Sequence, residues 1–185
     1  MKNKALWIIV AIIVLLGLWV WSSYNSLITL NESADNQWAK VETQYQRRFD
    51  LIPNLVNSVK GIMKQEQTIF GALADARTRY SGATTPNAKA QAAGEVETAL
   101  SRLLVIVENY PELKSSQNVA DLMAQLEGTE NRVSVERTRF NDTIRDYNVT
   151  IKRFPGSVIA GMFGFGERSY FQAQTGAENA PQVNL

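Results

Sequence analysis

The stretch ALWIIVAIIVLLGLWVW, residues 5–21, contains no charged side chain. As an α-helix with a rise of about 1.5 Å per residue it covers roughly 25 Å, and the next turn completes a hydrocarbon core of about 30 Å. Trp7 lies near one end, and Trp19 and Trp21 lie near the other, where the interfaces of a bilayer favour aromatic rings. We therefore predict a transmembrane helix over residues 5–24.

A cleaved signal peptide is the competing interpretation of this stretch. Its 17 uncharged residues exceed the usual apolar region of about 7–15 residues. The bulky sequence WVWSSYNSL at 19–27 offers no cleavage site of the A-x-A kind. A lipidated cysteine cannot replace the anchor, because the chain has no cysteine. We expect an uncleaved anchor.

The charges beside the span predict its orientation. Lys2 and Lys4 precede it, Glu32 and Asp35 follow it, and the first basic residue beyond it is Lys40. Short loops rich in Lys and Arg stay on the cytoplasmic side of a membrane. We expect a single pass through the cytoplasmic (inner) membrane, with the N-terminus in the cytoplasm and the C-terminal domain periplasmic or otherwise extracytoplasmic.

The charge of the remaining chain gives no reason to expect a nucleic-acid partner. Of 19 Lys and Arg residues two precede the span, which leaves 17 against 18 Asp and Glu. The longest basic cluster is the pair Arg47–Arg48, which is too short to make a basic patch. Binding to nucleic acid is therefore not expected.

Most of the remaining chain carries apolar residues at helical spacing. Pro53 predicts a kink or break in the first helix, unless the helix continues to a stop at Lys60–Gly61. The loop SGATTPN at 81–87 separates the second helix from the third. The apolar seam of the fourth helix recurs about every 3.5 residues, as in coiled coils. The predicted helices span about 25–60, 62–80, 87–108 and 118–153, and an apolar segment follows at 154–171.

Four amphipathic helices with short connections favour an all-α fold, in which an antiparallel up-and-down four-helix bundle follows the transmembrane helix. The fourth helix of such a bundle returns toward the membrane and brings the apolar segment near the bilayer. The alternative is that the aromatic residues of this segment cap the base of the bundle. The candidate membrane-proximal residues are Phe154, Phe163, Phe165, Tyr170 and Phe171. The predicted organisation is a cytoplasmic N-terminus at 1–4, the transmembrane helix at 5–24, the extracytoplasmic bundle at 25–171 and a flexible tail at 172–185.

The chain has neither histidine nor cysteine. This excludes the usual catalytic triads, the H-E-x-x-H zinc site, the Glu-x-x-His ligands of di-iron bundles and thiol chemistry. Glu127 and Glu130 share a helical face at i, i+3, but a solvated helix carries such pairs routinely. No glycine-rich phosphate loop of a recognised form occurs. We expect no enzymatic activity, no cofactor and no bound metal.

Polar residues interrupt the apolar seam of the fourth helix at Thr129 and at the pair Glu136–Arg137. Buried polar groups need partners, and the first helix offers several. The result is either an internal network that fixes the register of the helices or a site that an external ligand or peptide completes. Gly128, in the middle of this helix, predicts the close approach of a neighbouring helix. The candidate residues are Arg47, Arg48, Asp50, Glu130, Glu136 and Arg137.

Specific motifs occur in a fixed order along almost the whole chain. They are YNSL at 24–27, QWAKVETQYQRRFDLIPNLVNSVKG at 37–61, ADART at 74–78, ENYPELKSSQN at 108–118, LEGTENRVSVERTRFNDTIRDYN at 126–148, FPGSVIA at 154–160 and GFGERSYF at 164–171. With these motifs behind an N-terminal anchor, the chain resembles the LemA family. The resemblance implies an anchored four-helix bundle outside the cytoplasm in a bacterial cell envelope, without an established reaction or cofactor. It also implies other envelope membrane proteins, such as membrane proteases, as candidate partners.

Two functions are compatible with these observations. The first is a membrane-anchored scaffold or adaptor that recruits another envelope protein or a second copy of itself. The alternative is a sensor module that holds a ligand or peptide in a groove between the first and fourth helices, near Arg47, Glu130 and Arg137. The expected partners are the lipid bilayer, envelope proteins and, in a homo-oligomer, a second copy of this chain.

Overall fold

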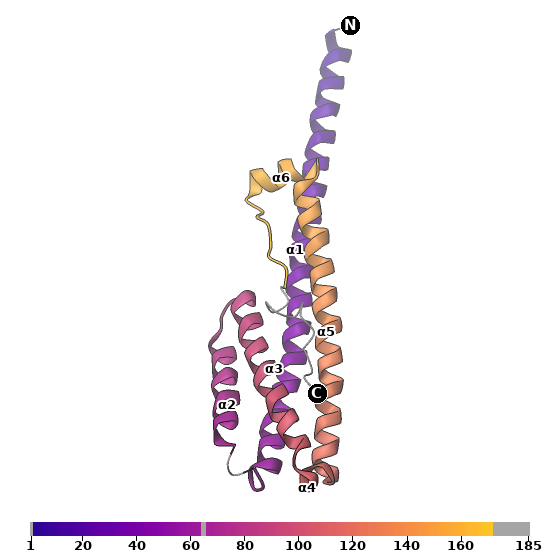
Figure 1. The fold of residues 1–185 in the computed structure, drawn as a ribbon. Helices are drawn as coiled ribbons and strands as arrows, with labels where there is room; N and C mark the ends of the chain where they lie inside the picture. The colour runs from indigo at the N-terminus through magenta and orange to yellow at the C-terminus, as the bar shows by residue number, and fades with distance from the viewer. Residues whose placement is uncertain (1, 64–65, 172–185) are drawn as a thin grey trace, which may run out of the picture. The chain divides into compact units, whose positions relative to one another are not determined.

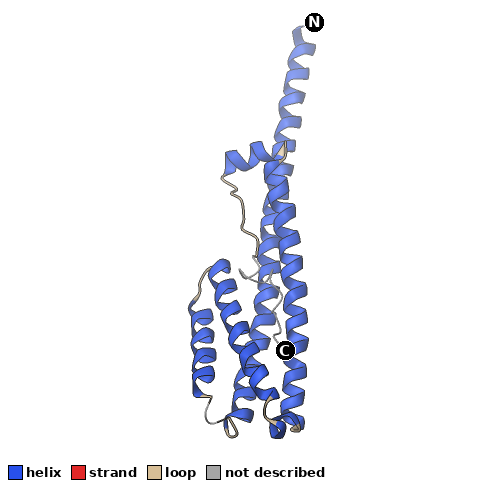
Figure 2. Ribbon diagram, in the orientation of Figure 1, coloured by secondary structure: helices blue, strands red, loops and turns tan. Residues whose placement is uncertain are grey.

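A computed structural model describes residues 2–63 and 66–171 of the chain. This part is α-helical and contains no strand, which confirms the predicted all-α class (Figure 1, Figure 2). The predicted tail at 172–185 lies outside the described residues. The helices are α1 (Lys2–Lys60), α2 (Gln67–Gly82), α3 (Pro86–Glu108), α4 (Pro111–Lys114), α5 (Gln117–Lys152) and α6 (Gly156–Phe163).

The first helix is uninterrupted from the N-terminus to Lys60, and Pro53 lies inside it. The sequence left two places open for the first break, Pro53 and Lys60–Gly61. The helix runs through Pro53 and ends at Lys60. Proline removes one backbone hydrogen bond, but Ile52 and Leu55 are buried on either side of it and hold the helix against the core. The helix ends where the backbone N–H groups of residues 62 and 63 both donate to the Val59 carbonyl, at 3.1 and 3.0 Å.

The second helix begins at Gln67, later than residue 62, where the apolar pattern starts. Ile62 and Met63 lie in the turn after α1, and Met63 is fully buried there. An apolar side chain buried from a turn gives the same sequence signal as one on a helix. This is why the pattern extended the helix too far toward the N-terminus.

Local sequence sets the start of α3 and the position of α4. Pro86 occupies the first turn of α3, and the Thr85 hydroxyl accepts a hydrogen bond from the Ala88 N–H at 3.2 Å, as an N-cap does. α4 is a single turn in what the sequence pattern indicated was a connection, and Leu113 in it is buried.

The chain forms two compact units. Unit 1 comprises Met1–Gln37 and Arg139–Tyr170, and unit 2 comprises Trp38–Thr138 and Phe171–Leu185. Because α1 and α5 are long, each contributes residues to both units.

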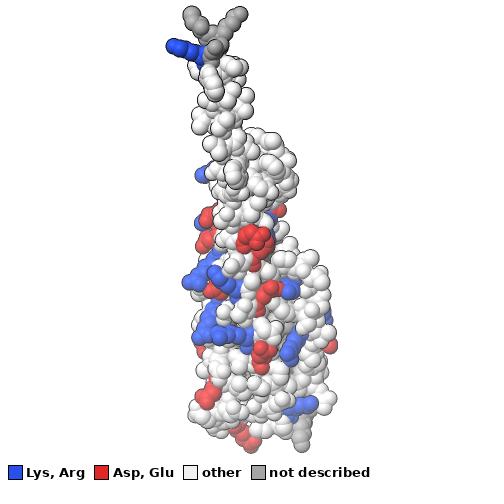
Figure 3. Space-filling view, turned by 180° about the vertical axis from the view of Figure 1, so that it is seen from behind, with Lys and Arg blue, Asp and Glu red and all other residues white. Residues whose placement is uncertain are grey.

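Unit 1 contains an exposed apolar segment and a small core. α1 is the one helix among the described residues that is long and apolar enough to cross a membrane, and its most apolar window is entirely exposed. On the face shown in Figure 3, this segment carries no charged side chain below its N-terminal tip. The core joins α1 to the end of α5 and to α6. Its buried members are Leu27, Tyr147, Ile151, Ile159 and Ala160, with Val20, Tyr24, Leu30 and Phe165 partly buried around them.

Unit 2 has a larger core, to which α1, α2, α3, α4 and α5 contribute buried residues. α2 and α3 run side by side in opposite directions (Figure 1). Aromatic rings fill the centre, where Phe49 lies 5.7 Å from Tyr45 and 4.5 Å from Tyr80 between ring centroids. The buried residues include Tyr45, Phe49, Ile52 and Leu55 of α1, Leu73 and Tyr80 of α2, Val96, Leu100 and Leu103 of α3, and Leu126 and Val133 of α5.

Candidate functional site

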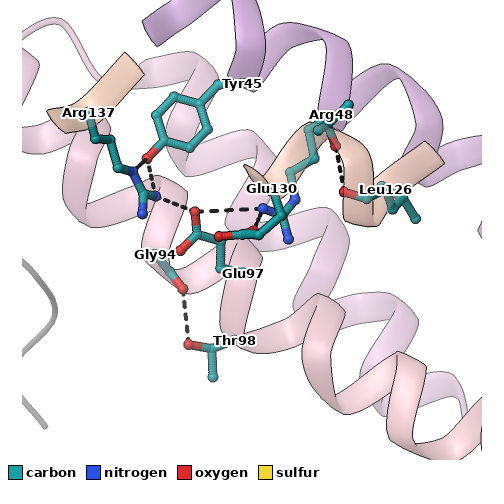
Figure 4. Close-up of polar contacts among 9 residues, drawn as sticks. Tyr45, Arg48, Gly94, Glu97, Thr98, Leu126, Glu130 and Arg137 are labelled. Carbon is teal, nitrogen blue, oxygen red and sulfur yellow. Dashed lines mark hydrogen bonds and ion pairs between the residues drawn. The ribbon is translucent and has the colours of Figure 1, made fainter. Parts of the chain in front are cut away.

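Four charged side chains meet inside unit 2, next to a buried tyrosine (Figure 4). Arg48 of α1 forms an ion pair with Glu130 of α5, and its Nη1 lies 3.9 Å from Oε1 of Glu97 on α3. Arg137 of α5 donates to Glu97 through Nη2 and to the Tyr45 hydroxyl through Nε, at 2.8 Å for the latter. These five residues are the polar network. It joins three helices, and its two positive and two negative charges cancel.

Burial governs the electrostatics of the polar network. The Arg48 side chain is only 7% exposed, and loss of hydration lowers the pKa of its guanidinium, while Glu97 opposes the shift. Burial likewise raises the pKa of Tyr45, an effect that the adjacent Arg137 partly offsets. The phenol therefore stays neutral and accepts the hydrogen bond from Arg137. Charges taken out of water are costly unless they are paired, and here the pairing is internal.

Helical spacing brings these polar groups to the core. Tyr45 and Arg48 are three residues apart on α1, and both are buried. Glu130 and Arg137 are seven residues apart, which is close to two turns of α5 and places them on one face. Thr129 is buried beside them, and its hydroxyl donates to the Leu126 carbonyl at 2.7 Å. The polar interruption that the sequence places at Thr129 is thus satisfied within its own helix.

Two other predicted residues of this group, Arg47 and Asp50, lie outside the polar network. Arg47 and Asp50 are exposed, and the Asp50 carboxylate accepts a hydrogen bond from Gln46 Nε2 at 2.8 Å. At about 100° per residue, positions one before and two after Arg48 turn away from the buried face of α1. Glu136 is half-buried.

The sequence profile of the LemA family matches residues 37–185. The chain belongs to the LemA family. The LemA match contains every member of the polar network, whereas the exposed apolar segment of α1 precedes it. The LemA assignment thus rests on the helical region that carries the polar network and does not depend on the anchor.

Known relatives of this LemA chain include three proteins described as magnetosome proteins MamQ. MamQ of Magnetospirillum gryphiswaldense is 28% identical over 189 residues, an alignment that covers 86% of this chain and 70% of MamQ. MamQ 1 and MamQ 2 of Paramagnetospirillum magneticum are each 27% identical over 175 residues. Those alignments cover 80% of this chain and 64% of each relative. This chain thus spans slightly less than two thirds of the length of those two proteins.

Two members of the LemA polar network, Tyr45 and Glu97, were missed by the sequence analysis. Glu97 lies four residues after Ala93 and three before Leu100, both of which are fully buried. A carboxylate at that spacing on an amphipathic helix is a signal for a buried partner of opposite charge. The signal for Tyr45 is weaker, because a tyrosine in an apolar stripe needs no ionic partner.

The predicted aromatic residues of the apolar segment have different surroundings. Phe154 is 80% exposed, and Tyr170 is also exposed. The Phe163 ring is half exposed and packs 4.6 Å from the Tyr24 ring, while Phe165 is partly buried in the core of unit 1. Of these four aromatic side chains, Phe165 is the most buried.

Phe171 belongs to unit 2. Its ring stacks on Trp38 at 6.5 Å, and the Arg137 guanidinium lies 4.6 Å from its centre. The ring therefore shields the charged pair of the LemA polar network. These contacts occupy the Phe171 ring within unit 2, and its predicted place on a membrane-proximal surface stays a prediction.

The chemistry that the polar network itself offers is that of paired charges. Within residues 2–63 and 66–171, no group of three or more acidic side chains is gathered so that it could hold a metal ion. The polar network offers carboxylates and guanidinium groups that neutralise one another. Its arrangement fixes which faces of α1, α3 and α5 meet.

Proposed function

We propose that this LemA-family chain is a single-pass, non-enzymatic membrane protein of the bacterial cell envelope that serves as a scaffold or adaptor through protein–protein contact. The observation that carries the proposal is the continuity of α1. One uninterrupted helix, Lys2–Lys60, contains both an exposed apolar segment fit to cross a bilayer and buried core residues of unit 2. Such a helix ties a folded helical unit to an anchor without a linker.

In this proposal, unit 2 is an antiparallel up-and-down four-helix bundle outside the cytoplasm. Fully buried residues on α1, α2, α3 and α5 support the bundle, as do the short connections between these helices. Lys2 and Lys4 before the apolar segment, and Glu32 and Asp35 after it, support an N-terminus in the cytoplasm.

The polar network favours this function over the sensor alternative. That alternative needs Arg137 and Glu130 to be available to a ligand in a groove between α1 and α5. Arg137 is paired with Glu97 and Tyr45, and Glu130 is paired with Arg48. Since each charge already has a partner, a ligand would have to displace an internal ion pair to bind there.

A cleft of about 320 Å³ at the corner of α3, α4 and α5 is the surface that we propose for a protein partner. Apolar side chains dominate its lining, among them Leu113, Val119 and Met123. An unbranched methionine side chain adapts to partners of different shape. The cleft lies next to Tyr110–Pro111, where the chain turns from α3 into α4.

Site-specific photocrosslinking of the full-length protein in native membranes tests the scaffold role. A photoreactive residue at Ala124, which is exposed and lines the cleft, should yield a defined adduct with one protein. The control position is Thr138, which is exposed on the same helix and outside the lining of this cleft. Met123→Glu should abolish the adduct at Ala124. Recovery of only uncrosslinked monomer from both positions would contradict the scaffold role.

A further inference from the structure

We infer that α6 and its flanking residues, 154–166, lie in the interfacial layer of the bilayer and form a second lipid contact beside the anchor. This inference rests on the proposed function in one respect, namely that α1 spans the membrane. In this inference, the exposed apolar side of α6 contacts lipid and not another protein.

The composition of this segment is unusual for a surface exposed to water. The sequence FPGSVIAGMFGFG at 154–166 has no charged side chain between Arg153 and Glu167. Phe154 and Met162 are 80% and 67% exposed, and Val158 is also exposed. Exposed apolar side chains gathered on one short segment mark a surface that another apolar phase covers.

The two faces of α6 differ in what covers them. Ile159 and Ala160 are buried in the core of unit 1. Val158 and Met162 are four residues apart, so they share a face, and both are exposed. One side of α6 is thus packed against the chain, while the other is open and apolar.

Contacts within unit 1 fix the depth of α6 relative to the anchor. From Ala5 to Tyr24, α1 extends about 29 Å, which is close to the thickness of a hydrocarbon core. The end of that span therefore lies at Tyr24. The Tyr24 ring contacts Phe163 at 4.6 Å and Phe165 at 5.9 Å between centroids. These contacts place the C-terminal end of α6 at the level of a membrane interface.

The direction of α6 suits an interfacial helix. Figure 1 shows α6 lying crosswise to α1 within unit 1. With α1 crossing the bilayer, α6 runs along the membrane plane, and at about 12 Å it is too short to span. The charged residues that flank the segment are held together, because Lys152 Nζ lies 2.5 Å from Glu167 Oε1. A helix too short to span, with one face packed on the chain and an apolar face left open, suits the interfacial layer of a bilayer.

A bilayer fits the open face better than a second protein does. Val20 and Tyr24 of α1 pack around the same core as α6, so the open face adjoins the surface that the anchor presents to lipid. Trp19 and Trp21 are exposed near this end of the span, where tryptophan is favoured at interfaces. A partner protein on α6 would have to displace lipid that already surrounds the neighbouring helix.

Spin labels on single cysteines test this inference, since the natural chain contains no cysteine. Full-length Met162→Cys protein is labelled and reconstituted into vesicles of phosphatidylcholine and phosphatidylglycerol. Collisions with oxygen, which enters lipid, are compared with collisions with a water-soluble nickel chelate. The controls are Leu15→Cys in the span and Val105→Cys on α3, which at 62% exposure matches Met162. Val158→Cys repeats the measurement at a second position on the open face.

The ratio of oxygen to nickel collisions at positions 162 and 158 should be several times that at 105 and below that at 15. Nickel collisions at 162 and 158 equal to those at 105, with position 15 still shielded, would overturn the inference and leave the anchor intact. Dipolar broadening between labels at 162 would place a second copy on this face, and would also overturn it. If position 15 itself is open to nickel, the proposed anchor fails.

Discussion

At the residue scale, every charged side chain of the polar network is neutralised by another member of the network. Glu97 is shared by Arg48 and Arg137, so it holds α3 to both α1 and α5. The sequence pattern placed Arg137 on the apolar seam of α5 and offered Arg47, Arg48 and Asp50 of α1 as alternative partners. It could not indicate which of these residues pair, because pairing depends on how the helices are rotated against one another.

The substitution Glu97→Gln should destabilise the protein by about 3 kcal/mol, because it leaves the buried Arg48 and the partly buried Arg137 facing a single carboxylate. The matched control is Glu95→Gln, which removes the carboxylate of the exposed pair with Arg79 and should cost less than about 1 kcal/mol. Urea unfolding of the full-length protein in detergent, followed by circular dichroism, measures both. Equal effects of the two substitutions would show that the polar network does not hold the helices together.

Stability should fall at alkaline pH, and Tyr45 should contribute to the fall. Burial raises the pKa of Tyr45, so the folded state keeps its proton when the unfolded chain begins to lose it, above about pH 10. The stabilisation is therefore complete below that pH and is lost as the pH rises further. Tyr45→Phe should flatten the dependence of the unfolding free energy on pH in this range. An unchanged slope would contradict the assigned burial of the phenol.

Two glycines should respond to alanine in opposite ways. A Cβ at Gly156 would overlap the Thr150 carbonyl oxygen, so Gly156→Ala should destabilise unit 1. At Gly128 nothing lies within 4 Å of a Cβ, and the predicted close approach of a neighbouring helix there was wrong. Alanine has a higher helix propensity than glycine in the interior of a helix. Gly128→Ala should therefore stabilise the protein by about 1 kcal/mol. Thermal unfolding of both variants measures the signs, and the same sign for both would contradict this account.

At the element scale, the ends of helices depend on local contacts that periodicity does not report. α3 spans Pro86–Glu108, where the sequence predicts about 87–108, and its start has a cap and a proline. α2 begins at Gln67 and not near 62, because Met63 is buried from a turn. α6 was left without an assigned structure, since an apolar run of that length fits a helix, a strand or a packed loop equally well.

The segment after α6 is held to unit 1 by hydrogen bonds that no sequence pattern indicates. Asn148 makes two with the Arg168 backbone, at 2.8 and 3.0 Å. The Arg168 side chain reaches Asn31 at 2.9 Å and pairs with Asp35. These contacts link α1 and α5 through an extended chain, across more than 130 positions in sequence. Together they form a strap across unit 1.

Arg168→Ala should loosen this strap. Loss of its charged hydrogen bonds should speed amide exchange in residues 164–170 by about tenfold or more, while α5 keeps its protection. Arg153→Ala, which removes an exposed arginine near the same segment, is the control and should leave exchange unchanged. Hydrogen–deuterium exchange with mass spectrometry measures both. The Tyr147 hydroxyl also donates to the Gly166 carbonyl, at 2.9 Å. Unchanged exchange in Arg168→Ala would contradict a role for its side chain, and would mean that the Tyr147 and Asn148 hydrogen bonds suffice to hold the segment.

At the scale of the whole molecule, the all-helical class could be predicted because apolar residues recur at helical spacing along most of the chain. The family could be predicted because its motifs keep their order from residue 24 to residue 171, and the family profile matches residues 37–185. The division into two units could not be predicted, since α1 and α5 pass through both without a break in their pattern.

The central claim is that α1 crosses the membrane and carries unit 2 on its outer side. Single cysteines at Asn3 and Val105, in otherwise natural full-length protein, test it with a membrane-impermeant maleimide applied to intact spheroplasts. The account predicts labelling of Val105→Cys in intact cells and labelling of Asn3→Cys only after the membrane is permeabilised. Labelling of both positions in intact cells, or protection of Val105→Cys, would contradict it.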